Sequence, residues 1–263
     1  MTSSRTVATP QGTTGGPPLR LVFNSLLRAD FLVFLKHRRA LIISMMLPVF
    51  VLVSTTGNRA TNKFGGAEFV IGLAISYGLL STALIGYALT VARDREKGVF
   101  QRLRVTPAPT WTIMASRLAM QAIANLIIAI AVVILGSLIH HISPSPGQYA
   151  LVLLVSILAG AVFLSLGQAL VGLVKSADSV QAVARVLFAV LILLGILGQS
   201  GAFGPFWSSV ARWSPVGAVM TLFAGVLDLH SWYSRDTLSV LACLGYIVVF
   251  AGIGIRWFQW DAR

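Results

Sequence analysis

The stretch from Phe69 to Ala92, FVIGLAISYGLLSTALIGYALTVA, decides the fold class of this chain. It contains no Asp, Glu, Lys or Arg, and its length falls within the ~17–25 residues that a helix needs to cross the hydrocarbon core of a bilayer. Backbone polar groups in lipid must be satisfied within the segment, and an α-helix does this. The stretch therefore predicts a membrane-spanning helix.

Five further stretches share this apolar, uncharged character: residues 40–56, 118–139, 150–174, 186–203 and 238–255. The first of them is short and contains Pro48, which predicts a kink. The whole chain of 263 residues is 56% hydrophobic and only 11% charged, with a mean hydropathy of +0.84. Soluble domains carry roughly 25% charged residues. We therefore predict an all-α polytopic membrane protein with six transmembrane helices.

The distribution of positive charge predicts the orientation of these helices. Sixteen of the 20 Lys and Arg lie before the first stretch, between the second and third, between the fourth and fifth, or after the last. The opposite side has only Arg59, Lys63, Arg212 and Arg235. Cytoplasmic loops carry the excess of Lys and Arg, so we expect both termini in the cytoplasm and a multi-pass protein of the plasma membrane. This topology accounts for the net charge of +12, and we expect no nucleic-acid partner.

The N-terminal region divides into two parts. Residues 1–18 are rich in Thr, Ser, Gly and Pro and have no apolar run, which predicts a disordered tail. In residues 19–39, Arg20, Asn24 and Arg28 recur every four residues on one helical face, with apolar residues near the opposite face. This pattern predicts an interfacial helix that contacts membrane lipids. A solvated linker next to the membrane is the alternative.

The loop at residues 93–110 is the most informative local sequence, and it reads RDREKGVFQRLRVTP from Arg93 to Pro107. It is densely charged, yet Val99, Phe100 and Leu103 recur at helical spacing. Gly98 is suited to end the preceding helix, and Thr106-Pro107 biases the chain away from a helix. A short amphipathic helix here would bury its apolar side against the membrane surface or a partner. A basic loop lying on lipid is the alternative.

This loop resembles that of a known family. Arg95-Glu96-Lys97-Gly98, Leu103-Arg104 and Thr106-Pro107, followed by a basic Arg117, resemble the corresponding segment of ABC-2 type permeases. These are the membrane subunits of ATP-binding cassette exporters, and the similarity is to drug-resistance permeases such as the daunorubicin exporter. The resemblance covers residues 19–263 and implies an ABC-2, type V exporter-like permease fold, with an N-terminal interfacial helix and six spans.

The resemblance also implies a function. Two permeases would form a homodimer or heterodimer, each docked on a separate ATPase subunit, and would export an amphipathic, lipid-like or drug substrate, as in multidrug efflux and antibiotic resistance. The ATPase-coupling loop would comprise Arg95, Glu96, Lys97, Gly98, Phe100, Leu103, Arg104, Thr106 and Pro107. A translocation path at the dimer interface would include Ser76, Tyr77 and Gln199.

The sequence contains no Gly-x-x-x-x-Gly-Lys-Ser/Thr phosphate-binding loop. We therefore expect ATP and Mg²⁺ to be bound by the partner ATPase, and no catalytic residue, cofactor or metal site in this chain. An ion-coupled secondary transporter and an integral membrane enzyme are the alternatives. The first usually needs an ionisable group at membrane depth, and the six stretches contain no acid. The second needs a converging cluster of carboxylates and histidines, which the sequence does not suggest.

The segment at residues 204–237 is too long for a simple turn on the outer side. Residues 216–229 are largely apolar but too few to cross the membrane. We expect short helices that dip into the outer leaflet, with Trp207, Trp213, Trp232 and Tyr233 in the interfacial belt.

Overall fold

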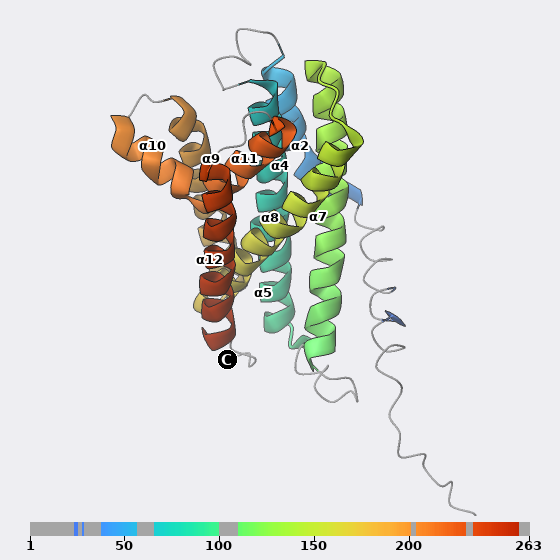
Figure 1. Cartoon of the computed structure of the whole chain (residues 1–263). Coiled ribbons are helices and arrows are strands. Elements are labelled where there is room, and N and C mark those ends of the chain that lie inside the picture. The colour runs from blue at the N-terminus through green and yellow to red at the C-terminus, as the bar shows by residue number, and fades with distance from the viewer. Residues whose placement is uncertain are drawn as a thin grey trace, which may run out of the picture.

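The computed structural model describes residues 24, 25, 28, 38–56, 66–99, 110–200, 204–229 and 234–257. Within these residues all regular structure is helical (Figure 1). The predicted tail at residues 1–18 lies outside the described residues. So does most of the predicted interfacial helix at residues 19–39, of which residues 24, 25 and 28 are helical and residues 38 and 39 begin α2.

The helices follow the apolar stretches of the sequence. They are α2 (Arg38–Ser54), α4 (Ala67–Ser81), the π-helical η1 (Thr82–Ala88), α5 (Leu89–Glu96), α7 (Thr110–His140), α8 (Pro146–Leu173), α9 (Ala177–Ser200), α10 (Gly204–Trp213), α11 (Pro215–Leu227) and α12 (Ser234–Trp257). α4, η1 and α5 run on as one continuous helix of 30 residues. The prediction of an all-α polytopic membrane protein is confirmed.

Five of these helices are long and apolar enough to cross a membrane, and the bent pair α10–α11 can be counted as a sixth span. The five are the continuous helix at Ala67–Glu96, α7, α8, α9 and α12. The first predicted span corresponds to α2, which has 17 residues and continues through Pro48. α10 and α11 are bent by 80° relative to each other, as expected for short helices that do not cross the membrane separately.

Several predicted helix boundaries are wrong in the same way, because the helices extend beyond their apolar stretches. Arg117 and Arg185 were expected in loops but lie within α7 and α9, and residues 93–96 belong to α5 rather than to the following loop. The apolar stretch marks only the part of a helix that lies in hydrocarbon. The backbone hydrogen bonds continue beyond that part, where charged side chains reach water without cost to the helix.

The helix at Ala67–Glu96 forms the centre of the bundle. Within its most apolar window 83% of the residues are buried, against 17% for α12. It packs against α2, α7, α8, α9 and α11. Ile71, Ile75 and Leu79 are completely buried along it. α12 lies at the periphery, where it packs along α8 and against α11 (Figure 1).

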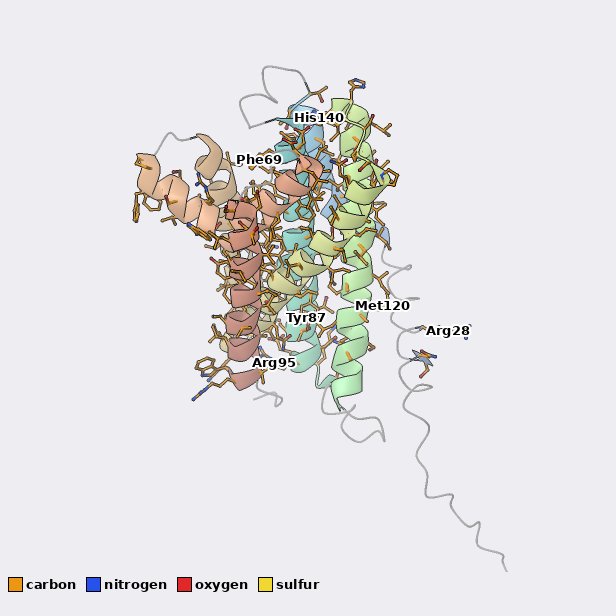
Figure 2. The ribbon with its side chains drawn as sticks, viewed as in Figure 1. Arg28, Phe69, Tyr87, Arg95, Met120 and His140 are labelled. Carbon is orange, nitrogen blue, oxygen red and sulfur yellow. The ribbon has the colours of Figure 1, made fainter. Side chains whose placement is uncertain are left out.

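Arg95 and His140 lie at opposite ends of the bundle (Figure 2). We refer to these as the Arg95 end and the His140 end. The His140 end also carries Phe69, and the Arg95 end carries the C-terminal part of α12 (Figures 1 and 2). The turn at residues 174–176, between α8 and α9, lies at the Arg95 end because Arg95 is hydrogen-bonded to it.

Small residues let the backbones of α8 and its neighbours approach closely. A Cβ atom on Gly167 of α8 would lie 2.9 Å from the carbonyl oxygen of Ala83 in η1. A Cβ atom on Gly254 of α12 would lie 2.8 Å from Cγ of Gln168. Close approach through small residues is how membrane helices gain van der Waals contact without a hydrophobic driving force between them.

Gly167→Ala is expected to destabilise the protein by about 1–3 kcal/mol, because the added methyl group meets a backbone oxygen that cannot rotate away. The measurement is the thermal unfolding midpoint in mild detergent. Gly245→Ala is the matched control, since a Cβ atom there meets nothing within 4 Å. A Gly167→Ala protein as stable as the Gly245→Ala protein would show that α8 and η1 are less tightly packed than described.

Candidate functional site

Three consecutive side chains at the end of α5 contact three different helices. Asp94 pairs with α7, Arg95 with the C-terminal end of α8, and Glu96 with the first residue of α9. We call Asp94, Arg95, Glu96 and these partners the helix-end cluster. It lies where the central helix leaves the bundle and the segment at residues 97–109 begins (Figure 2).

Arg95 is buried, with 5% of its surface exposed. Its Nη1 donates to the carbonyl oxygen of Val171 at 2.8 Å, and its Nη2 donates to those of Val174 at 2.7 Å and Lys175 at 2.6 Å. The last carbonyl groups of a helix have no partner inside the helix and carry partial negative charge. The guanidinium fork therefore caps α8, and these bonds offset the cost of burying its charge.

Glu96 acts on the opposite side of the same turn. Its Oε1 accepts a hydrogen bond of 2.6 Å from the backbone N–H of Ala177, where α9 begins. The first N–H groups of a helix are unsatisfied and attract a carboxylate. Ser176 completes the helix start by accepting from the N–H of Ser179 at 3.1 Å. The α8–α9 turn thus receives a cation at the end of one helix and an anion at the start of the next.

Asp94 forms an ion pair with Arg117 of α7. The two side chains are 22% and 20% exposed, respectively. The pair joins α5 to α7 at the two sides of the segment at residues 97–109. Because ion pairs that water reaches contribute little, this tie is weaker than the buried contacts of Arg95.

Gly98 ends the central helix as predicted. Its φ is +66°, in the left-handed region that glycine adopts without strain, and its N–H donates to the carbonyl oxygen of Arg95 at 3.1 Å. Lys97, at the C-cap, is exposed. The other predicted coupling residues, Phe100, Leu103, Arg104, Thr106 and Pro107, lie outside the described residues. Their coupling role, and that of Arg95 to Gly98, stays a prediction.

The residues predicted for a translocation path lie on two helices. Ser76 is fully buried, and its hydroxyl donates to the carbonyl oxygen of Gly72 in its own helix. Tyr77 is 1% exposed, and its hydroxyl donates to the carbonyl oxygen of Ile192 in α9 at 2.8 Å. In the single chain both side chains are thus packed between helices. The side chain of Gln199 lies outside the described residues, and the path itself stays a prediction.

Polar contacts inside the bundle gather around η1. The hydroxyl of Tyr87 donates to Oε1 of Gln168 at 2.8 Å, and that of Thr82 donates to Oδ1 of Asn125 at 2.7 Å. Asn125 belongs to α7 and Gln168 to α8, so both amides bond to the central helix. The partners Thr82 and Tyr87 were missed, as was the π-helix, a feature often found at functional sites.

These observations define a multi-pass helical membrane protein with a charged cluster at one end of its central span. The family profile of the ABC-2 type transporters matches residues 22–227, which is more than half of the chain. The chain therefore belongs to the ABC-2 type transporter family and is a membrane component of a transport system. A search of curated proteins finds no match to the chain.

Glu96→Ala is expected to speed hydrogen exchange of the Ala177 amide, because the substitution removes the acceptor of that N–H. Glu96→Gln should retain most of the protection, since its side-chain oxygen can still accept. The measurement is hydrogen exchange of peptides covering the start of α9, with Lys97→Ala as the control at the neighbouring exposed position. Equal exchange in the Ala and Gln variants would contradict a capping role for Glu96.

Proposed function

We propose that this chain is the permease subunit of an ATP-binding cassette exporter in the plasma membrane, with the Arg95 end and both termini in the cytoplasm. Membership of the ABC-2 type transporter family supports this function. The distribution of Lys and Arg supports the orientation, because Arg93, Arg95, Lys97 and Arg117 gather at the Arg95 end. The transported substrate leaves at the His140 end.

The helix-end cluster is the observation that carries this proposal. The segment at residues 97–109 begins at the point where α5 is bonded to α7, α8 and α9. A protein outside the bundle that displaces this segment therefore acts on α7, α8 and α9 at once. An ATPase that closes on ATP needs such a contact point to change the tilt of membrane helices.

ATP and Mg²⁺ belong to a separate ATPase subunit in this proposal, because the chain has no phosphate-binding loop. A second permease, identical or different, completes the transporter. The substrate is an amphipathic, lipid-like or drug molecule. Supporting this class, the two helices of the predicted path carry no Asp, Glu, Lys or Arg over residues 69–92 of the central helix and 186–200 of α9, whereas a highly charged solute needs compensating charges at membrane depth.

An ATPase subunit is expected to co-purify with the chain in mild detergent from its own host, in stoichiometric amount. Replacing Phe100 and Leu103 with Ala should abolish this association, because the predicted apolar side of the coupling helix is lost. Replacing the exposed residues Phe206 and Leu229 with Ala is the matched control, because it removes the same side-chain types from the outer segment. Quantitative mass spectrometry of the purified complex measures the ratio.

Two results would contradict the proposal. A stable wild-type oligomer without any ATPase would favour an ion-coupled transporter or a membrane enzyme. Equal loss of the ATPase in the control variant would show that the association fails for reasons unrelated to the loop.

In proteoliposomes that contain the ATPase complex, Mg-ATP is expected to drive the transport of a fluorescent amphipathic cation. Orthovanadate should stop this transport, because it traps the ATPase. A small, highly charged dye should not be transported at a rate above that of protein-free liposomes. ATP-driven transport of the charged dye alone would contradict the proposed substrate class.

A further inference from the structure

We propose that Arg95 is a positioning residue that makes the α8–α9 turn, residues 174–176, follow the end of α5 as one rigid body. The inference rests on the proposed function, in which the ATPase displaces the segment that follows α5. It adds that the C-terminal end of α8 and the start of α9 move together with the end of the central helix.

The hydrogen bonds of Arg95 make the connection between α5 and the α8–α9 turn rigid. A planar guanidinium holds its donors in a fixed fork, and here the fork bonds to the carbonyl oxygens of Val171, Val174 and Lys175. These acceptors belong to the last turn of α8 and to the α8–α9 turn. Because Arg95 is buried, water does not compete for its hydrogen bonds. A movement of α5 relative to the turn would have to break all of these bonds together.

Glu96 adds a second tie with the opposite charge. It bonds to the N–H of Ala177, so the start of α9 is attached to the residue that follows Arg95. The charges match the helix ends that they meet, with the cation at the carbonyl end of α8 and the anion at the amide end of α9. α8 and α9 can therefore not separate at this turn without separating from α5.

A third contact extends the rigid body towards the other end of the membrane. The hydroxyl of Tyr77 in α4 bonds to the carbonyl oxygen of Ile192 in α9. The central helix and α9 are thus joined both at the Arg95 end and deeper in the bundle. α7 is joined to the central helix by the partly exposed pair Asp94–Arg117 at the Arg95 end and by the buried hydrogen bond between Thr82 and Asn125.

The test measures the distance between spin labels at Lys97→Cys and Ala182→Cys, both exposed positions, by dipolar EPR in the Cys243→Ala background. The sample is the complex with its co-purified ATPase, first without nucleotide and then trapped with Mg-ATP and orthovanadate. We expect one narrow distance that is the same in both states. Arg95→Met should replace it with a broad or shifted distribution, because methionine keeps an unbranched stem but has no donors.

Arg95→Lys should recover only part of the narrow distance, since an ammonium group can still donate to these carbonyl oxygens but lacks the fixed fork of donors. Arg93→Met is the matched control, because Arg93 lies on the same helix and is exposed. It should leave the distance unchanged. The amount of co-purified ATPase is measured in parallel, and distances are compared only between complexes of the same composition.

Two results would overturn the transmission role of Arg95 alone. One is a distance that changes on trapping in the protein with native Arg95. The other is an Arg95→Met protein whose distances equal those of the native residue in both states. The first result does not require the variant to fold. Failure of any ATPase to co-purify would instead overturn the proposed function, and the transmission role with it.

Discussion

Every helix that leaves the membrane presents carbonyl or amide groups that have lost their partners, and the rest of this structure depends on how that constraint is met at one turn. At the end of α8 the carbonyl groups are satisfied by Arg95, and at the start of α9 the first amide is satisfied by Glu96. Both side chains come from the end of the central helix. Capping two helices therefore also fastens them to a third.

The burial of the central helix is the feature that would let this fastening serve the proposed transmission as well as stability. The helix at Ala67–Glu96 is enclosed by its neighbours along most of its length, and Gly167 lets α8 approach the backbone of η1 closely. A rigid, enclosed helix transmits a displacement at its end to the elements around it. The π-helical turn in its middle, with Thr82 and Tyr87 bonded to α7 and α8, places polar contacts where that displacement would arrive.

Sequence reasoning succeeded where the residues of one segment determine the local structure of that segment. The apolar stretches predicted the helices, and Gly98 predicted the end of the central one because glycine accepts a left-handed backbone conformation. It failed at the charged ends, where Arg117 and Arg185 continue their helices beyond the apolar part. Charge marks the edge of the hydrocarbon region rather than the last hydrogen bond of a helix.

The resemblance around Arg95-Glu96-Lys97-Gly98 indicated the family, yet it suggested that these side chains form or flank a surface for a partner. In the folded chain Arg95 is buried in its own protomer, where it bonds to the end of α8, and the coupling role of the segment stays a prediction. The linear pattern of apolarity and charge was sufficient for the fold class, because lipid requires helices wherever a long apolar segment occurs. The partners of Arg95, Glu96 and Tyr77 lie 76 or more residues away along the chain, so tertiary packing alone decided which carbonyl and amide groups they meet.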